Sequence, residues 1–333
     1  MPERRHAPGA AATLGVVVIG RNEGDRLRRC VASVLPATAA VVYVDSGSDD
    51  GSPGWVAAQG VQVLNLDLSR PFTAARARNV GWRALVAHHP GLQHVAFVDG
   101  DCEVEAGWLA AAESFLQDHP QVVAVCGRRR ERQPEASVYN RLCDLEWDTP
   151  VGPARAVGGD AVFRLASLQA AGGYRDDLIA GEEPELCVRL RARGGEVWRL
   201  DMPMTLHDAA MHRFGQWWTR SVRAGHAFAE GAWLHGAAPE RHFVAETRRA
   251  LLWGLILPML CLMSAAWVSP WGLLGGLIYP LQWLRLGWRA RRRPWGWTQS
   301  GFLVLGKFAE AQGVLKFAAR AWSGRPRRLI EYK

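Results

Sequence analysis

Three short apolar runs mark the first hundred residues of the chain. They are residues 15–20, 40–44 and 95–98. Runs of this length, rich in β-branched residues, predict buried strands. Stretches with helical patterning lie between them, at residues 25–35, 54–59 and 73–88. Strands that alternate with helices predict an α/β fold with a mostly parallel sheet of right-handed βαβ units and flanking helices.

Acidic residues follow each of these runs. Glu23 comes after the first, Asp45 after the second, and Asp99-Gly100-Asp101 after the third. Ligands of open α/β sheets bind outside the carboxyl ends of the strands. Because two buried carboxylates are costly without a cation between them, the Asp-Gly-Asp segment predicts a Mn²⁺ or Mg²⁺ ion that holds a diphosphate. An ordinary turn is the alternative.

The geometry of that segment leads to two further expectations. If it stays extended, its period of two places the carboxylates of Asp99 and Asp101 on one face. Gly100, which has no side chain, would let a phosphate approach the backbone. We therefore expect a shared metal and diphosphate site at residues 99–101.

Seven motifs in a fixed order carry a resemblance to a known family. They lie at residues 17–23, 44–52, 77–81, 99–101, 158–164, 172–174 and 181–186. In this order they resemble family 2 glycosyltransferases, over about residues 14–228. The resemblance implies an inverting enzyme with a Rossmann-like GT-A type fold that uses nucleotide-diphosphate sugars.

Roles for the donor-site residues follow from these motifs. Asp101 is expected to bind the metal directly, with Asp99 near the ribose and the water shell of the metal. Asp45 is expected to contact the base or ribose, with an Asx turn or helix N-cap as its alternative. Arg21 and Glu23 would border the same pocket. Arg78 would meet a phosphate or Asp99, or else lie on a solvated helix face.

A general base and a third metal ligand are expected from the second half of the domain. Glu182 and Glu183 start a predicted helix, where the macrodipole favours an anion. The family motif reads Glu-Asp at these positions, and alignment with it favours Glu183 as the base and Glu182 as a sugar contact. Gly159 and Asp160 would form a floor near the sugar. His207 is the expected third metal ligand, and His212 is its competitor.

The membrane signal lies near the C-terminus. Residues 250–268 carry no charge and are just long enough to cross a bilayer, which takes about 20 residues. A second apolar stretch covers residues 271–284, and extends to residue 288 if Arg285 snorkels. Arginines flank the pair but not the turn between them, which favours a cytoplasmic catalytic domain at the inner cell membrane. A re-entrant pair, or a buried hairpin of a soluble protein, is the alternative.

Charge and cysteine content narrow the class of partner. The formal net charge is +8, and only Lys307, Lys316 and Lys333 are lysines. This balance favours nucleotide, lipid phosphate or a membrane surface. No sequence pattern supports nucleic acid as a partner.

The six cysteines form no C-x-x-C pair, which disfavours a structural zinc site or disulfide framework. The arginine-rich run 128–132 indicates a solvated face or a site for anionic lipid.

These observations define one primary hypothesis. Five segments are predicted: a disordered tail (1–13), the catalytic domain (14–230), a linker or interfacial helix (231–249), two transmembrane or re-entrant helices (250–288) and a basic amphipathic segment (289–333). The predicted activity is metal-dependent transfer of a sugar to a membrane-associated acceptor, either a glycolipid or a precursor of a cell-envelope polysaccharide. A membrane-tethered nucleotidyltransferase and a catalytically degenerate scaffold are the alternatives. The sequence leaves the sugar, the acceptor and the oligomeric state open.

Overall fold

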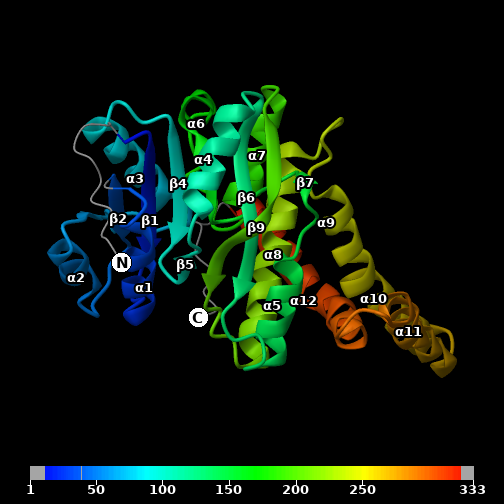
Figure 1. Ribbon diagram of the computed structural model, residues 1–333. Helices are drawn as coiled ribbons and strands as arrows, with labels where there is room; N and C mark the ends of the chain where they lie inside the picture. The colour runs from blue at the N-terminus through cyan, green and yellow to red at the C-terminus, as the bar shows by residue number, and fades with distance from the viewer. Residues whose placement is uncertain (1–11, 39, 324–333) are drawn as a thin grey trace. The chain divides into compact units, whose positions relative to one another are not determined.

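The computed structural model describes residues 12–38 and 40–323 (Figure 1). The predicted tail 1–13 therefore lies almost wholly outside the described residues, as does the end of the segment 289–333. The chain divides into two compact units. Unit 1 comprises Met1–Ala136, Cys143–Leu178 and Glu182–Ala209, and unit 2 comprises Ser137–Leu142, Ile179–Gly181 and Ala210–Lys333.

Unit 1 is built around a nine-stranded sheet. Its main path runs in the order β3-β2-β1-β4-β8-β6-β9-β5, and β7 pairs with β9. The strands are β1 (Leu14–Gly20), β2 (Val41–Asp45), β3 (Gln62–Asn65), β4 (His94–Asp99), β5 (Cys102–Val104), β6 (Val122–Glu131), β7 (Gly152–Pro153), β8 (Ala161–Arg164) and β9 (Glu196–His207). The part β3-β2-β1-β4 is parallel, as predicted, and β6 pairs parallel with β9. The pairings of β8, β5 and β7 are antiparallel, so the whole sheet is mixed.

Helices cover both faces of this sheet. They are α1 (Asp25–Val34), α2 (Ser52–Ala58), α3 (Ala74–His88), α4 (Trp108–Asp118), α6 (Leu165–Ala170) and α7 (Glu182–Ala192), with α5 (Val138–Trp147) partly in unit 2. Alternation along β1 divides the core, because successive side chains point to opposite faces. Val16 and Val18 belong to one apolar cluster, which includes Leu27 of α1, and Val17 belongs to the other, which includes Leu85 of α3.

The strongest sequence patterns match the observed elements. The three apolar runs form β1, β2 and β4, and the helical stretches between them form α1, α2 and α3. β3 is an element that the sequence patterning missed, because Gln62–Asn65 is a short and only half-buried strand. The predicted α/β fold is thereby confirmed, with a parallel N-terminal half.

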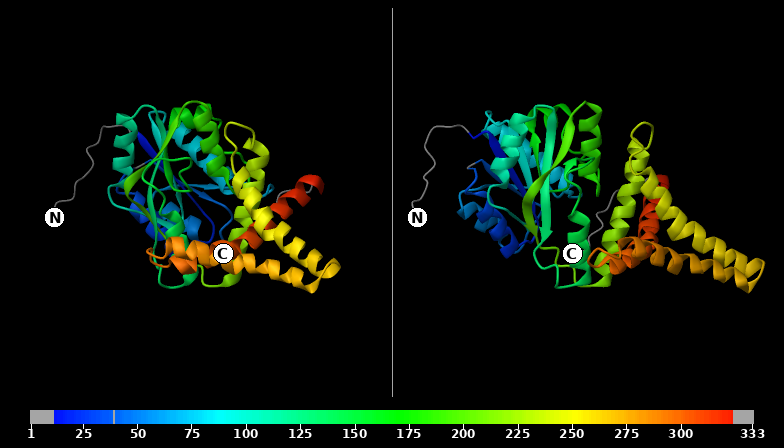
Figure 2. Two further views of the ribbon diagram at one scale, coloured as in Figure 1. Left: turned by 90° about the vertical axis from the view of Figure 1, so that its right-hand side faces the viewer. Right: turned by 45° about the vertical axis from the view of Figure 1, so that its right-hand side comes forward.

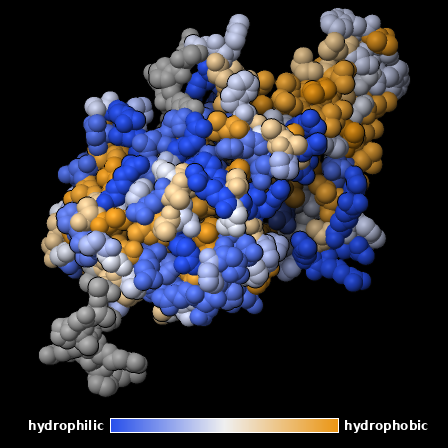
Figure 3. Space-filling view, turned by 90° about the horizontal axis from the view of Figure 1, so that it is seen from above, coloured by the Kyte–Doolittle hydropathy of each residue, from blue (hydrophilic) through white to orange (hydrophobic). Residues whose placement is uncertain are grey.

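Unit 2 is helical in its described part. Its helices are α8 (Phe214–His235), α9 (Val244–Leu251), α10 (Leu257–Trp267), α11 (Ile278–Ala290) and α12 (Gly296–Ser323), with a π-helical turn η1 (Leu252–Ile256) and a 3₁₀ segment η2 (Pro270–Leu277). Among the described residues, one continuous helix, Val244–Trp267, is long and apolar enough to cross a membrane by length and composition. Only 6% of its most apolar window is buried. In Figure 3, exposed apolar residues of this part of unit 2 gather at the upper right, where the surface is orange.

The second predicted membrane stretch does not form a helix of that length. It is divided into η2 and α11, since Pro270 and three glycines interrupt the α-helical pattern. This part turns back along α10: the Tyr279 hydroxyl donates to the Trp253 carbonyl oxygen at 2.6 Å, and Gly275 lies against Cys261. Residues 252–290 therefore form a helical hairpin with its turn near Ser269 (Figure 2). The structure thus has one helix of spanning length and a shorter returning arm. That the pair spans the membrane or is re-entrant stays a prediction.

Candidate active site

The Asp-Gly-Asp segment forms a turn at the end of β4. β4 ends at Asp99, Gly100 and Asp101 make the turn, and β5 begins at Cys102. The condition for a shared face, an extended segment, is not met, and the two carboxylates lie in separate clusters. The Gly100 N–H donates to the Ile19 carbonyl oxygen at 2.8 Å, and a Cβ would lie 3.1 Å from that same oxygen. Gly100 thus allows β1 and the turn to pack closely. The approach of a phosphate at this residue stays a prediction.

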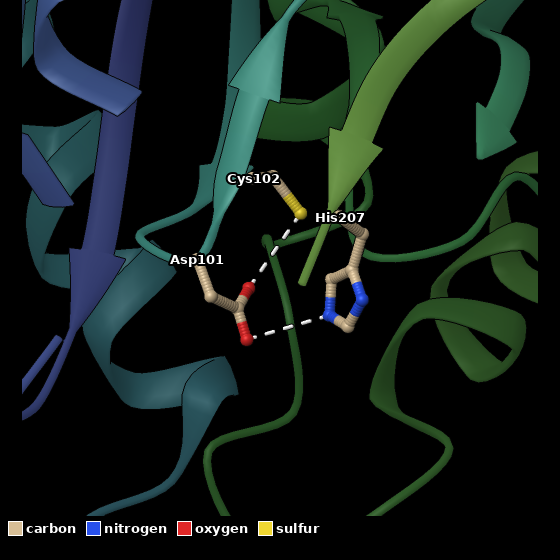
Figure 4. Close-up of side chains that lie close together, drawn as sticks. All are labelled: Asp101, Cys102 and His207. Atoms are coloured by element: carbon tan, nitrogen blue, oxygen red, sulfur yellow. Dashed lines mark hydrogen bonds and ion pairs between the residues drawn. The ribbon is translucent and has the colours of Figure 1, made fainter. Parts of the chain in front are cut away.

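Asp101, Cys102 and His207 form one of these clusters (Figure 4). His207 ends β9, and Asp101 Oδ2 lies 3.3 Å from His207 Nε2. Cys102 Sγ lies 3.6 Å from Asp101 Oδ1. Burial raises the pKa of the Cys102 thiol well above its ordinary value. A carboxylate oxygen and an imidazole nitrogen at this spacing suit a divalent cation, so these residues fit the predicted metal. His212 belongs to neither cluster found among the described residues.

The imidazole of His207 is held from behind by two residues that the sequence patterning missed. Glu131 Oε2 lies 3.7 Å from His207 Nδ1, and its side chain is fully buried. Its oxygens also accept the N–H groups of Gln133 and Ala209, which fix the carboxylate in place. The ring of Trp147 meets the His207 ring edge-on at 4.7 Å between centroids. This arrangement leaves Nε2 of His207 oriented toward Asp101.

Replacing Glu131 tests this arrangement. Outer partners that orient a ligating histidine typically contribute 10- to 100-fold to metal affinity. We expect Glu131→Gln to weaken Mn²⁺ binding by about tenfold, because the amide removes the negative charge behind the imidazole. Isothermal titration with MnCl₂ measures the change, with Glu113→Gln as a control acid of unit 1. Equal Mn²⁺ affinities in Glu131→Gln and the parent protein would contradict this role.

Asp99 belongs to a second, ionic cluster. Its Oδ1 accepts a hydrogen bond from Arg78 Nη2 at 2.8 Å, and its Oδ2 lies 3.5 Å from Arg129 Nη2. Asp160 accepts from Arg129 at 2.7 Å, from the Asp99 N–H at 2.9 Å and from the Thr205 hydroxyl at 2.8 Å. Burial opposes ionisation of Asp99, but the Arg78 and Arg129 guanidiniums outweigh it and lower its pKa to about 2. This geometry gives Asp99 two guanidinium partners, Arg78 and Arg129. Its place near the ribose and the water shell of the metal stays a prediction.

Gly159 lies directly against this ionic cluster. A Cβ at this position would lie 2.7 Å from Asp99 Oδ2 and 3.0 Å from Arg78 Nη2. Any larger residue would displace the Asp99 carboxylate from its guanidinium partners. Gly159 and Asp160 thus both lie next to Asp99. Arg78 contacts the same cluster and is buried, so it does not lie on a solvated helix face.

The ionic cluster also predicts a stability effect. Asp99→Asn removes a charge-assisted hydrogen bond to Arg78, whose side chain is only 3% exposed, and should cost about 2 kcal/mol of unfolding free energy. Urea unfolding at pH 7 measures this cost. A lowered pKa in the folded state stabilises above the ordinary value of 3.8, and that contribution disappears as pH falls toward 2. The destabilisation should therefore shrink over this range. The exposed Asp25→Asn is the control, and equal losses in both variants would refute the prediction.

The other residues predicted to contact the nucleotide, Asp45, Arg21 and Glu23, have contacts outside these two clusters. Asp45 accepts hydrogen bonds from Tyr43, from the N–H groups of Gly47 and Ser48, and from the Ser48 hydroxyl. These four donors place Asp45 in an Asx turn, which was its alternative role. Its contact with the base or ribose stays a prediction. Arg21 lies over the Phe72 ring at 4.8 Å, and Glu23 pairs with Arg26 at 2.8 Å. Both lie just beyond β1, at the carboxyl edge of the parallel strands.

The paired glutamates at the start of α7 have different surroundings. Glu182 Oε1 accepts from Arg78 Nη1 at 2.8 Å, which connects it to the Asp99 cluster. Glu183 is buried, and its Oε1 accepts from the Val157 N–H at 2.7 Å and from Cys187 Sγ at 3.0 Å. Burial raises the pKa of Glu183 above its ordinary 4.5, although the hydrogen bonds from Cys187 and Val157 oppose the shift. A raised pKa makes Glu183 the stronger proton acceptor once it is ionised.

The arginine-rich run at the end of β6 is paired with acids. Arg128 pairs with Asp144 at 3.1 Å and with Asp148 at 3.2 Å. Arg130 contacts Glu105, and Arg132 contacts Glu103. These partners neutralise charge along the run, as on a solvated face. A site for anionic lipid stays a prediction. Arg129 and Glu131 alternate with these arginines and point inward, Arg129 to Asp160 and Glu131 to His207. The alternation of side chains along a strand was the sequence signal that could have identified both residues.

The parallel strands with an acidic carboxyl edge, the Asp101–His207 pair and the glutamates of α7 form the arrangement expected of a GT-A type domain. Residues 15–153 match the model of Glycosyl transferase family 2. The Pre-mycofactocin glycosyltransferase of Mycobacterium tuberculosis (strain CDC 1551 / Oshkosh) is 26% identical over 204 residues, which are 58% of this chain and 42% of that protein. The chain thus spans less than half the length of that relative.

Solved structures show the same fold. The mannosyltransferase PcManGT from Pyrobaculum calidifontis, in complex with GDP-Man and Mn²⁺, has a TM-score of 0.62 at 20% identity, over 91% of this chain and 87% of its own. S. aureus TarS 1-349 in complex with UDP-GlcNAc has a TM-score of 0.51 at 14% identity, over 95% and 93% of the two chains. At these identities the similarity establishes the fold.

Proposed function

We propose that the protein is an inverting glycosyltransferase that transfers a sugar from a nucleotide-diphosphate sugar to a membrane-associated acceptor. The observation that carries this proposal is the 3.3 Å approach of Asp101 and His207 at the strand edge of a family 2 domain. The nucleotide sugar and Mn²⁺ named with PcManGT support the same donor class here. The acceptor class is a glycolipid or a precursor of a cell-envelope polysaccharide.

Donor binding is assigned to the two clusters of the strand edge. Asp101 and His207 would hold a Mn²⁺ or Mg²⁺ ion, which would supply Lewis-acid stabilisation of the charge on the departing diphosphate. Asp99, held ionised by Arg78 and Arg129, accepts a hydrogen bond from a ribose hydroxyl. Its side chain is 28% exposed, which leaves it accessible to a ligand.

The base is assigned to Glu183, as the family alignment suggests. The acceptor oxygen attacks the anomeric carbon while the bond from that carbon to the diphosphate oxygen breaks. The hydroxyl proton passes to a Glu183 carboxylate oxygen, and the nucleoside diphosphate leaves. Glu182 orients Arg78, and the single displacement inverts the anomeric configuration. The raised pKa of Glu183 supports this assignment.

Membrane association is proposed for the hairpin of unit 2. Its exposed apolar residues include Leu260, Leu262 and Trp267, each more than half exposed. A core helix of a soluble protein would bury such residues. Arg248 and Arg249 precede the hairpin, and Arg289 and residues 291–293 follow it. Both basic flanks on one side of a returning hairpin support a cytoplasmic orientation at the cell membrane.

A donor screen tests the proposed function. Purified protein with MnCl₂ is heated with UDP-, GDP- or dTDP-sugars, and the shift of the unfolding temperature reports binding. We expect one nucleotide series to stabilise the protein, with loss of the shift in Asp101→Asn. Stabilisation by nucleoside triphosphates alone, with incorporation of nucleotide into product, would favour the nucleotidyltransferase. Donor binding without any turnover toward lipid or saccharide acceptors would favour the scaffold.

A further inference from the structure

We propose that Cys102 is a third metal ligand beside Asp101 and His207, and that its thiolate makes the site prefer Zn²⁺ and Cd²⁺ to Mn²⁺ and Mg²⁺. The inference takes the location of the metal site from the proposed function. Its chemistry is nevertheless independent of transferase activity, so the two can fail separately.

Backbone pairing places the thiol and the imidazole together. Cys102 of β5 lies directly opposite His207 of β9 in an antiparallel pair. Side chains directly opposite each other in such a pair lie on the same face of the sheet. Asp101, the residue just before Cys102, directs its carboxylate to both of them, as the dashed lines in Figure 4 show. The three side chains thus converge from two adjacent strands.

The spacing of the three ligand atoms fits one ion. The Asp101–His207 and Asp101–Cys102 separations are 3.3 Å and 3.6 Å, and all three ligand atoms lie within 4.8 Å of one another. Tetrahedral zinc with bonds of about 2.0–2.3 Å places its ligand atoms about 3.3–3.8 Å apart. Two of the three separations between ligand atoms already have this length, so metal binding requires little movement of the side chains.

A second cluster competes for the same sulfur but is occupied by cationic side chains. Asp99, Cys102 and Asp160 also lie within 4.8 Å of one another. Arg129 Nη2, however, lies 2.7 Å from Asp160 and 3.5 Å from Asp99. The Arg78 guanidinium binds Asp99 from another side. A divalent cation there would meet two positive charges at close range, which leaves the Asp101 side as the one that a cation favours.

The identity of the metal follows from the softness of the ligands. Thiolate and imidazole favour zinc and other soft ions, while Mn²⁺ and Mg²⁺ favour oxygen ligands. When Zn²⁺ or Cd²⁺ binds, a metal–sulfur bond forms and the thiol proton of Cys102 is released to the buffer. With Mn²⁺ or Mg²⁺, Cys102 keeps its proton and its contact with Asp101. The cysteine therefore acts as a specificity-determining residue for the metal.

Titration of the full chain with Cd²⁺ tests for the metal–sulfur bond. We expect a saturable sulfur-to-cadmium charge-transfer absorption in the ultraviolet in the parent protein, and its loss in Cys102→Ser. Cys126→Ser, another buried thiol of unit 1, and Cys261→Ser, at the least buried cysteine, are matched controls and should keep the absorption. A band that persists in Cys102→Ser and disappears in a control would overturn the proposal.

Competition tests the preference itself. Displacement of bound Mn²⁺ by Zn²⁺, followed by electron paramagnetic resonance of the released Mn²⁺, should need at least about tenfold more Zn²⁺ in Cys102→Ser than in the parent protein. An unchanged Zn²⁺/Mn²⁺ ratio would contradict the role of the thiol. If the variant fails to fold, X-ray absorption of the zinc-loaded parent protein replaces it. One sulfur at about 2.3 Å from zinc supports the proposal, and an all N/O shell refutes it.

These outcomes separate the inference from the proposed function. A protein without transferase activity that keeps the Cys102-dependent cadmium absorption refutes the function and supports the ligand. An active transferase that lacks the absorption supports the function and refutes the ligand.

Discussion

Asp101→Asn is expected to lose nearly all metal-dependent transfer, with kcat/KM lower by about 100- to 1000-fold. Asp101 is the carboxylate that directly faces His207 Nε2, at 3.3 Å. The amide keeps the shape but removes the negative charge that holds the cation near the leaving diphosphate. Initial rates of sugar transfer at saturating MnCl₂ measure the effect.

The control for this variant separates the site from the fold. Asp25→Asn changes an exposed acid on α1 of the same unit and should leave the rate unchanged. Circular dichroism should show the same secondary structure in both variants. A rate in Asp101→Asn within about threefold of the parent, a change of under 1 kcal/mol, would exclude Asp101 from the metal site.

Glu183→Gln is expected to lower kcat by about 100- to 10,000-fold. The glutamine cannot accept the proton of the attacking hydroxyl, while the nearby donor cluster of Asp99 and Arg78 stays intact. The KM for the nucleotide sugar should therefore change little. Steady-state kinetics with varied donor concentration distinguish the two parameters.

The pH profile assigns the effect to the base. The rate requires ionised Glu183, so kcat/KM falls as pH drops through its pKa in the free enzyme. Because burial raises this pKa above 4.5, the acid limb should lie above the ordinary glutamate range. Glu182→Gln, the matched control on the same helical turn, should keep that limb and raise the donor KM instead. If Glu182→Gln, and not Glu183→Gln, abolishes transfer, the base is Glu182.

The periodic parts of the chain could be predicted because their signal is local. Strands such as β1 and helices such as α3 bury continuous or amphipathic patterns that one window of sequence displays. β3 was missed because a half-buried edge strand lacks that pattern. The Asp-Gly-Asp segment takes the turn that was its alternative, because the Gly100 N–H donates to the Ile19 carbonyl oxygen.

Much of the candidate site depends on contacts that no single window contains. Arg129 and Glu131 lie within a charge run, and only the pairing of β6 with β9 brings them to Asp160 and His207. The role of Cys102 likewise depends on its pairing with His207. Asp45 shows the reverse case, since its neighbours Gly47 and Ser48 already indicated the turn that it forms.

Mn²⁺-dependent release of nucleoside diphosphate with formation of an inverted glycoside tests the central claim most directly. The donor chosen by thermal shift is incubated with membrane lipid extract and MnCl₂, and the anomeric configuration of the product is determined by NMR. The account predicts an inverted glycoside whose formation stops with chelator and in Asp101→Asn. Transfer that continues at full rate in Asp101→Asn with chelator present, or a product with retained configuration, would contradict it.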